Sequence, residues 1–241
     1  MTSSATRTLF LAGFLAVGTG PAFAADLSGG PLPGDDPFPL PATYTAPWFV
    51  GVRGGVAFPG DTTFNAIGTD IDTSYQTGGF VGAFVGYDFD GGRKGGGGLR
   101  GELEVDRIWA DVDSQTVAGT GAFTDGLAGG TTTATVGFAN LYYDLPFSPG
   151  ITPFLGGGIG IASVDFSDHM AGGAALLSDS DTGFAWNLTS GVDIALTEST
   201  DLELGYRYMQ ISGIDVTALS GQKSTVDLDD HMLFAGIKMR F

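Results

Sequence analysis

The residues of this sequence with the clearest chemical potential are its two histidines, His169 and His231. Ser163, Asp165 and Ser167 lie close to His169 in the chain, so a nucleophile, a base and an orienting acid are all present. They fall in one polar segment that we expect to be a loop, which would not hold nucleophile and base within hydrogen-bond distance. We therefore interpret both histidines as exposed loop and rim residues, and expect no catalytic residue, no metal site and no enzymatic activity.

Two other patterns resemble ligand-binding motifs but lack essential parts. The glycines at 95–98 follow Lys94, but the segment lacks the Gly-Lys-Ser/Thr ending and the helix of a phosphate loop, so we interpret it as a turn. Aspartates recur at positions 61, 70, 72, 165, 168, 179 and 181 without the spacing of a calcium-binding loop. We interpret them as solvated acids and expect no cofactor.

A third set of charged residues occupies alternate positions within otherwise apolar segments. Its nine members are Arg53, Arg100, Glu102, Asp144, Asp193, Glu203, Arg207, Lys238 and Arg240. Asp88, Glu104 and Asp106 occupy equivalent positions. If these side chains share an enclosed space, they must pair, because each unpaired buried ion costs several kcal/mol.

The segments that carry these charges alternate between apolar and polar residues with a period of two, which is typical of β-strands with unlike faces. Glycine, at 41 of 241 residues, opposes helix and also favours strands in tight packing. The strands that we expect span residues 48–58, 78–89, 99–112, 133–145, 152–163, 183–196, 201–211 and 226–241. The alternation blurs at Arg107 and Ile108, where we expect a bulge.

The connections between these strands alternate in length. Residues 91–98, 147–150 and 197–200 are short links, whereas the long polar stretches lie at 59–73, 113–131, 165–182 and 212–224. Short turns at one end and long loops at the other are characteristic of outer-membrane barrels. The sequence therefore predicts an all-β fold, an eight-stranded antiparallel up-and-down transmembrane β-barrel over residues 47–241. Because the number of strands is even, the first and the last strand should both have their terminus on the periplasmic side.

The N-terminal region has the features of an exported protein. Arg7, the apolar run at 9–17 and the small-x-small site Ala22-Phe23-Ala24 predict a cleaved signal peptide over residues 1–24. Residues 25–46 contain five prolines and predict an extended periplasmic linker. A net charge of −17 argues against nucleic acid as a partner, and the absence of cysteine fits passage through an oxidising compartment.

A soluble secreted barrel of the lipocalin kind would show the same alternation, with its apolar face turned inward. The polar face here is rich in glycine and alanine, which suits a narrow lumen better than a surface in water. The apolar face carries aromatic residues, several near strand ends: Trp48, Tyr87, Tyr143, Trp186 and Tyr206. The chain ends on the alternating apolar residues Ile237, Met239 and Phe241. These features favour a membrane-spanning barrel over a soluble one.

The ordered motifs of the chain resemble the outer-membrane β-barrel family of small surface proteins, typified by opacity proteins and by immunogenic outer-membrane proteins of α-proteobacteria. The matching motifs are AFAADL at 22–27, WFVG at 48–51, NLYYDL at 140–145, TPFLGGGIG at 152–160, FAWN at 184–187 and GIKMRF at 236–241. The resemblance implies an eight-stranded barrel whose terminal residues Phe241, Met239 and Ile237 are recognised by the barrel-assembly machinery. It implies no shared ligand.

These observations predict an integral protein of the Gram-negative outer membrane with a structural and surface-presenting role and a mostly plugged lumen, since eight strands leave a bore that side chains fill. The expected partners are outer-membrane lipid and lipopolysaccharide, the assembly machinery, and a possible surface ligand bound through the long loops. Two alternatives remain: a small porin-like channel with an open lumen, and an adhesin that binds its ligand through those loops.

Overall fold

The computed structural model describes residues 46–66, 69–90, 97–124, 127–219 and 221–241. The predicted signal peptide at 1–24 and all but residue 46 of the predicted linker lie outside the described residues, as do positions 91–96 of the short link at 91–98. The described part of the chain contains no helix with the length and apolar character of a membrane-spanning one.

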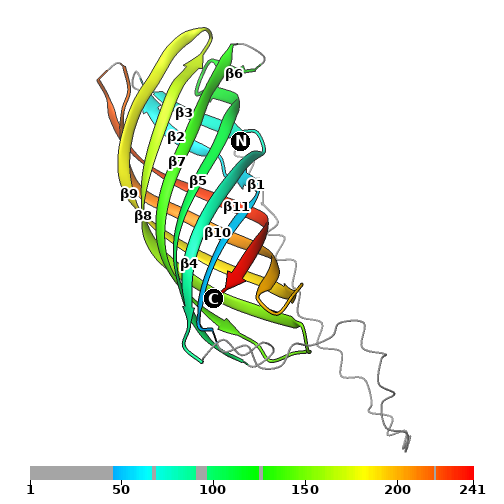
Figure 1. Ribbon diagram of the computed structural model, residues 1–241. Helices are drawn as coiled ribbons and strands as arrows, with labels where there is room; N and C mark the ends of the chain where they lie inside the picture. Colours follow the sequence, from blue (N-terminus) through cyan, green and yellow to red (C-terminus); the bar gives the residue numbers. More distant parts are fainter. Residues whose placement is uncertain (1–45, 67–68, 91–96, 125–126, 220) are drawn as a thin grey trace, which may run out of the picture. The chain divides into compact units, whose positions relative to one another are not determined.

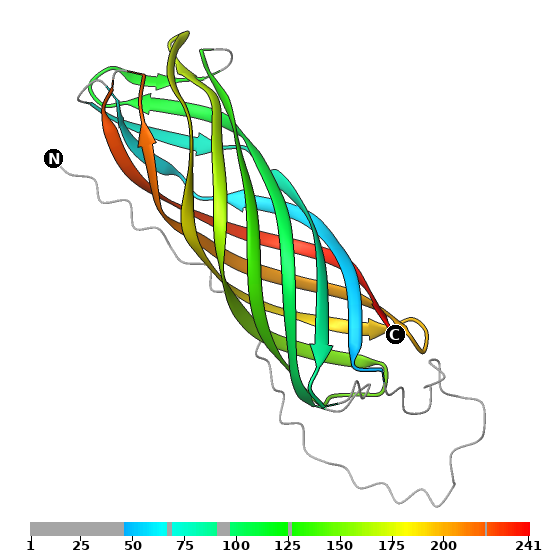
Figure 2. The same cartoon turned by 60° about the vertical axis from the view of Figure 1, so that its left-hand side comes forward.

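Eight antiparallel strands form a hydrogen-bonded ring (Figures 1 and 2). In ring order they are β1 (Trp48–Pro59), β4 (Gly78–Asp88), β5 (Gly98–Val117), β7 (Ala128–Asp144), β8 (Ile151–Ala171), β9 (Ala174–Ala195), β10 (Thr200–Thr217) and β11 (Lys223–Arg240). Each strand pairs with its neighbours in up-and-down order, and β5 pairs directly with β7. The predicted fold class is confirmed.

The first and last strands close the ring. Their ladder runs without interruption from the pair Phe49–Arg240 to the pair Pro59–Asp230. Beyond it, the Phe241 amide donates a hydrogen bond of 3.0 Å to the Trp48 carbonyl. Closure removes the unpaired edges that an open sheet would expose, which is the condition for spanning a bilayer with strands.

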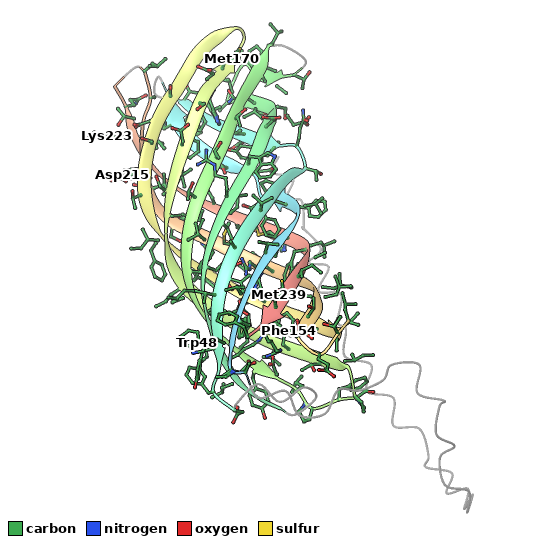
Figure 3. The ribbon with its side chains drawn as sticks, viewed as in Figure 1. Trp48, Phe154, Met170, Asp215, Lys223 and Met239 are labelled. Atoms are coloured by element: carbon green, nitrogen blue, oxygen red, sulfur yellow. The ribbon has the colours of Figure 1, made fainter. Side chains whose placement is uncertain are left out.

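The alternation along the strands separates a lipid-facing surface from an interior. Outward side chains such as Leu103 and Ile161 are more than 60% exposed, whereas the intervening charged residues are buried. Aromatic pairs lie toward the two ends of this surface: the rings of Trp48 and Tyr87 are 5.0 Å apart, and those of Trp186 and Tyr208 are 5.5 Å apart. In Figure 3, Trp48 and Met239 lie toward the end that holds the C-terminus, and Lys223, Asp215 and Met170 toward the other.

Glycines on the inner face make room for large side chains in a narrow interior. A Cβ atom on Gly51 would lie 2.2 Å from the Phe84 ring, and one on Gly86 would lie 2.1 Å from the Phe49 ring. Both positions therefore require glycine, because the phenylalanine rings occupy the space that any larger side chain would take.

The prediction of long polar loops is wrong for much of their length, because the ring strands extend beyond the apolar belt. β8 and β9 continue as one hairpin to a turn at Gly172 and Gly173, which have φ values of +60° and +77°. Short strands β2 (Thr62–Ala66), β3 (Thr69–Tyr75) and β6 (Gly121–Phe123) attach through β5. Figure 1 shows β2, β3 and β6 at the end opposite the C-terminus. We call this region the extension; it consists of these short strands and the ends of the ring strands that lie beyond the apolar belt.

The extension has its own apolar interior, which explains why it forms strands. Its inward apolar side chains belong to one continuous buried cluster, which includes Phe64, Ile71, Val164, Phe166, Ile214 and Val216. Buried polar side chains such as Thr73, Gln115 and His169 lie in the same region. Polar residues alternate with these inward side chains on the outside and dominate the composition, so these segments appear loop-like in sequence although they keep the period of two.

The bulge predicted at Arg107 and Ile108 is absent from the described ladder of β5. Both residues pair in register with β4 and with β7. Arg107 continues the outward face of β5, and Ile108 is buried. The blur in the sequence marks the place where the outward face becomes polar while the inward face becomes apolar.

Candidate functional site: an ion network inside the barrel

The structure places all nine charged residues of the predicted network inside the barrel, each at most 9% exposed. Asp88, Glu104 and Asp106 join them, as does Asp201, which the sequence did not single out because it starts a strand beside a tight turn. We call these residues the ion network. All ring strands except β8 contribute a charged or hydrogen-bonded polar side chain to it. On β8, a Cβ atom at Gly158 would lie 1.9 Å from the Asn140 side-chain oxygen, so glycine there leaves room for the network.

The level nearest the chain end holds two cations. Arg240 forms an ion pair with Asp88 across the closure, and its Nε lies 3.1 Å from Asp201 Oδ2. Lys238 forms an ion pair with Asp193. These contacts join the last strand to β4, β9 and β10.

The middle level is built on Arg53 and Arg100. Arg53 lies 2.8 Å from Glu102, 3.2 Å from Glu104 and 3.3 Å from Glu203. Arg100 lies 3.1 Å from both Asp144 and Glu102, and 3.6 Å from Glu203. Because Arg53 comes from β1, Glu102 from β5 and Glu203 from β10, these contacts cross the bore rather than follow its wall.

The upper level is built on Arg207, which lies 2.7 Å from Asp106 and 2.8 Å from Glu104. Its Nε donates to the Thr189 hydroxyl at 3.1 Å. Neutral side chains complete this level: the Asn140 amide donates to Glu104 at 2.7 Å, and the Asn187 amide donates to Asn140 at 2.8 Å. Such multiple bonding is what a buried ion requires.

Aromatic rings fill the space around the guanidinium groups. The Arg53 Cζ atom lies 4.0 Å from the centre of the Phe84 ring, and Arg100 Cζ lies 4.4 Å from the centre of Phe154. Stacking of this kind supplies a cation–π attraction and leaves less room for water beside the ions.

The histidines differ from expectation in one case. His231 is exposed, and its Nδ1 lies 2.7 Å from the Tyr206 hydroxyl. His169, interpreted as an exposed loop residue, lies instead on β8 and is 1% exposed. Its Nε2 lies 3.1 Å from the Thr132 hydroxyl, and burial lowers its pKa to about 4. The prediction of exposure fails because β8 extends far beyond the apolar belt.

The possible hydrolytic set does not come together. Ser163 and Asp165 are exposed on the outer face of β8, whereas His169 is buried inside. The Ser167 hydroxyl donates to Asp165 and not to the imidazole. Within the described ranges, no group of three histidine, aspartate or glutamate side chains could hold a metal ion.

The predicted assembly residues lie together on the outside of the last strand. Ile237 and Met239 are outward on β11, 37% and 53% exposed, and Phe241 follows them at 63%. They form an apolar row beside the closing seam. Their role in assembly stays a prediction.

Curated proteins match this chain over about a third of its length. An uncharacterized protein of Brucella abortus is 39% identical over 83 residues, which are 31% of this chain and 29% of that protein. The outer membrane protein PagN of Salmonella typhimurium is 29% identical over 82 residues, 32% of this chain and 34% of that protein. This chain thus matches only about a third of either relative's own length.

Solved structures align over more of the chain at low identity. Neisserial surface protein A aligns with 80% of this chain and 97% of its own, at 17% identity and a TM-score of 0.49. OprG of Pseudomonas aeruginosa aligns with 82% and 98%, also at 17% identity and a TM-score of 0.49. Residues 38–241 match the family described as the outer membrane protein beta-barrel domain. The chain therefore belongs to this family and is an integral β-barrel protein of the Gram-negative outer membrane.

Proposed function

We propose that this protein has a structural and surface-presenting role and that its lumen conducts no ions. The observation that carries the proposal is the set of contacts from Arg53 to Glu102, Glu104 and Glu203, which cross the bore between β1, β5 and β10. A water column would have to separate these buried partners.

A second barrier supports the same conclusion. Beyond the ion network, inward side chains such as Ile108, Val164 and Ile211 are almost completely buried in the apolar cluster. An ion that passed the network would meet an interior filled by packed side chains, most of them apolar, where losing its water is costly. The rigid strands of the extension, with polar side chains outside, are suited to present a surface beyond the membrane, which is where any surface ligand would bind.

Two predicted processing steps belong to this proposal. We infer that the signal peptide is removed after Ala24 and that residues 25–46 remain as a periplasmic linker. N-terminal sequencing of protein isolated from outer membranes tests the first. Resistance of this segment to protease added to intact cells tests the second.

The lumen is tested by conductance of the full chain in planar bilayers, after a gel of boiled and unboiled samples has shown a folded barrel. The wild type should give no stable current steps. The double variant Arg53→Ala/Glu102→Ala removes a contact that crosses the bore and should raise conductance. Lys223→Ala/Asp227→Ala removes two exposed charges of the extension and serves as the control.

Current steps of the wild type comparable to those of a general porin would overturn the proposal in favour of the channel. Such a channel should prefer cations, since the carboxyl groups of the ion network outnumber its cations eight to five. A double variant that conducts no more than the control would contradict the role of the network as the barrier.

A further inference from the structure

The lipid-facing wall contains a shallow apolar hollow of about 880 Å³ that the barrel itself does not use. Its floor lies on β7, where the outward residues are Gly137 and Ala139. Larger side chains stand on both sides, Leu103 and Val105 on β5 and Ile159, Ile161 and Phe184 on β8 and β9. The hollow therefore runs along β7 between two apolar ridges.

The depth of the hollow depends on Gly137. This residue pairs in register with Val105 on one side and Ile161 on the other. A Cβ atom added to Gly137 would meet no atom within 4 Å, so the protein packs nothing above this position. In a membrane this space is filled by hydrocarbon, and a groove with raised sides contacts one chain more closely than a flat wall does.

A basic residue marks the extracellular end of the hollow. Arg107 follows Val105 by two positions on the outward face of β5, and it pairs with Thr135, the outward residue next to Gly137 on β7. Arg107 is exposed, and its Nη1 donates to the Thr135 hydroxyl at 2.6 Å. It forms no ion pair with a carboxylate in the part of the chain that the structure describes. Its guanidinium therefore keeps donors for an external anion.

The depth of Arg107 in the membrane follows from its neighbours. The next outward residue on β5 is Trp109, 42% exposed, at a position where tryptophan marks the headgroup level. Beyond it, Asp111 accepts a hydrogen bond from Thr131. Arg107 thus lies at the border between the apolar belt and the polar extension, on the side away from the chain end. This is the depth of lipid phosphates in the outer leaflet.

We propose that this surface is a binding site for the phosphorylated glycolipid of the outer leaflet, lipopolysaccharide. A phosphate of its lipid A accepts hydrogen bonds from Arg107, and one acyl chain lies along Gly137 and Ala139. Guanidinium groups bind phosphate through paired, charge-assisted hydrogen bonds, and the apolar ridges bury the chain. The proposal rests on the outer-membrane location and not on the closed lumen, so the two can fail independently.

The test measures binding of purified lipid A to the full chain in detergent by native mass spectrometry, with folding checked on a gel of unboiled samples. Arg107→Gln should weaken binding about tenfold, because it removes the charged donor. Gly137→Leu should weaken it by a similar factor, since the new side chain occupies the hollow from a position where a Cβ atom meets no other atom within 4 Å. If Gly137→Leu does not fold, Gly137→Ala is tested in its place.

Matched controls carry the same chemical changes elsewhere. Lys223→Gln removes an exposed positive charge from the extension, and Ser190→Leu adds leucine at an exposed outward position of β9. Both should bind as the wild type does. Dephosphorylated lipid A should bind wild type and Arg107→Gln equally, and phosphatidylglycerol should bind the wild type more weakly than lipid A does.

Equal binding of lipid A to wild type, Arg107→Gln and Gly137→Leu would overturn the proposal. So would preferential binding of phosphatidylglycerol, which would assign the site to phospholipid. A change in oligomeric state that appears only in Gly137→Leu, without a change in lipid binding, would instead show that the hollow joins two copies of the chain.

Discussion

Inside the barrel, water does not reach the ion pairs, so the loss of one ionic partner changes the stability more than it would at the surface. Glu203 is completely buried, with its two oxygens 3.3 Å from Arg53 and 3.6 Å from Arg100. Neither arginine can turn toward water, because aromatic rings stack on both. Removing this carboxylate takes one attraction from each guanidinium, which keeps its other carboxylate partners, and leaves polar atoms without a partner where water does not reach.

Glu203→Ala should consequently lower the free energy of unfolding by about 1–3 kcal/mol. Urea unfolding of the barrel refolded in lipid vesicles measures this change. Glu198→Ala, in the exposed turn before β10, is the matched control and should shift stability by about 0.5 kcal/mol or less. A similar shift for both variants would show that water reaches the ion network.

His169 makes the stability of the extension depend on pH. Burial lowers its pKa from 6.5 to about 4 in the folded state. Between these values the unfolded segment binds a proton and the folded one does not, so stability is full above pH 6.5 and falls as the pH drops toward 4. The difference corresponds to roughly 3 kcal/mol. Hydrogen exchange of β8 and β9 amides, corrected for intrinsic rates, should show this loss in the wild type and not in His169→Gln.

At the scale of strands, the extension uses side chains where the backbone ladder ends. The pairing of β9 with β10 stops at Phe184 and Ser212, before Gly213, which has a φ of +75°. Beyond this point, Asp181 accepts from the Asp215 amide and Asp179 from the Thr217 amide, each at 2.7 Å. The two carboxylates therefore connect β9 to β10 where the backbone hydrogen bonds between these strands have ended.

Asp179→Ala/Asp181→Ala should therefore loosen the upper parts of β9 and β10 without unfolding the ring, since it frees two amide donors. Amide exchange in the part of β10 that follows Ser212 should become several-fold faster, and exchange in the part that precedes Ser212 should not change. Asp113→Asn, an exposed acid without a hydrogen-bond partner among the described residues, is the control. Faster exchange throughout β10 would contradict a local role for these carboxylates.

Strand positions were predictable from sequence where one face of the strand stayed apolar and the other stayed polar along its length. Residues 183–196 alternate Trp186 and Leu188 with Asn187 and Thr189, and the structure places all but the last of these residues in β9. The extension was not predicted, because Val164 and Phe166 are separated by Asp165 in a segment rich in polar residues. The ionic partners inside the barrel depend on how strands far apart in sequence face one another across the bore, which no local pattern encodes.

The barrel is closed by a single ladder between its first and last strands, β1 and β11. At the end of that ladder, the Trp48 carbonyl accepts a hydrogen bond from the Phe241 amide. The ladder also brings Arg240 to Asp88 on β4, two strands away. The seam that closes the wall thus also carries one ion pair of the network.

Deleting Phe241 should leave the chain in the periplasm, degraded or aggregated. The deletion removes the aromatic end of the outward row formed with Ile237 and Met239, and it removes the last backbone bond of the seam. Fractionated cells, with boiled and unboiled samples compared on a gel, measure the folded protein in the outer membrane. Phe241→Trp keeps an aromatic end and the backbone amide and should assemble normally, whereas Phe147→Ala removes an exposed aromatic residue from a turn at the same end and should have little effect. Wild-type levels of the deleted chain in the outer membrane would show that assembly does not depend on this residue.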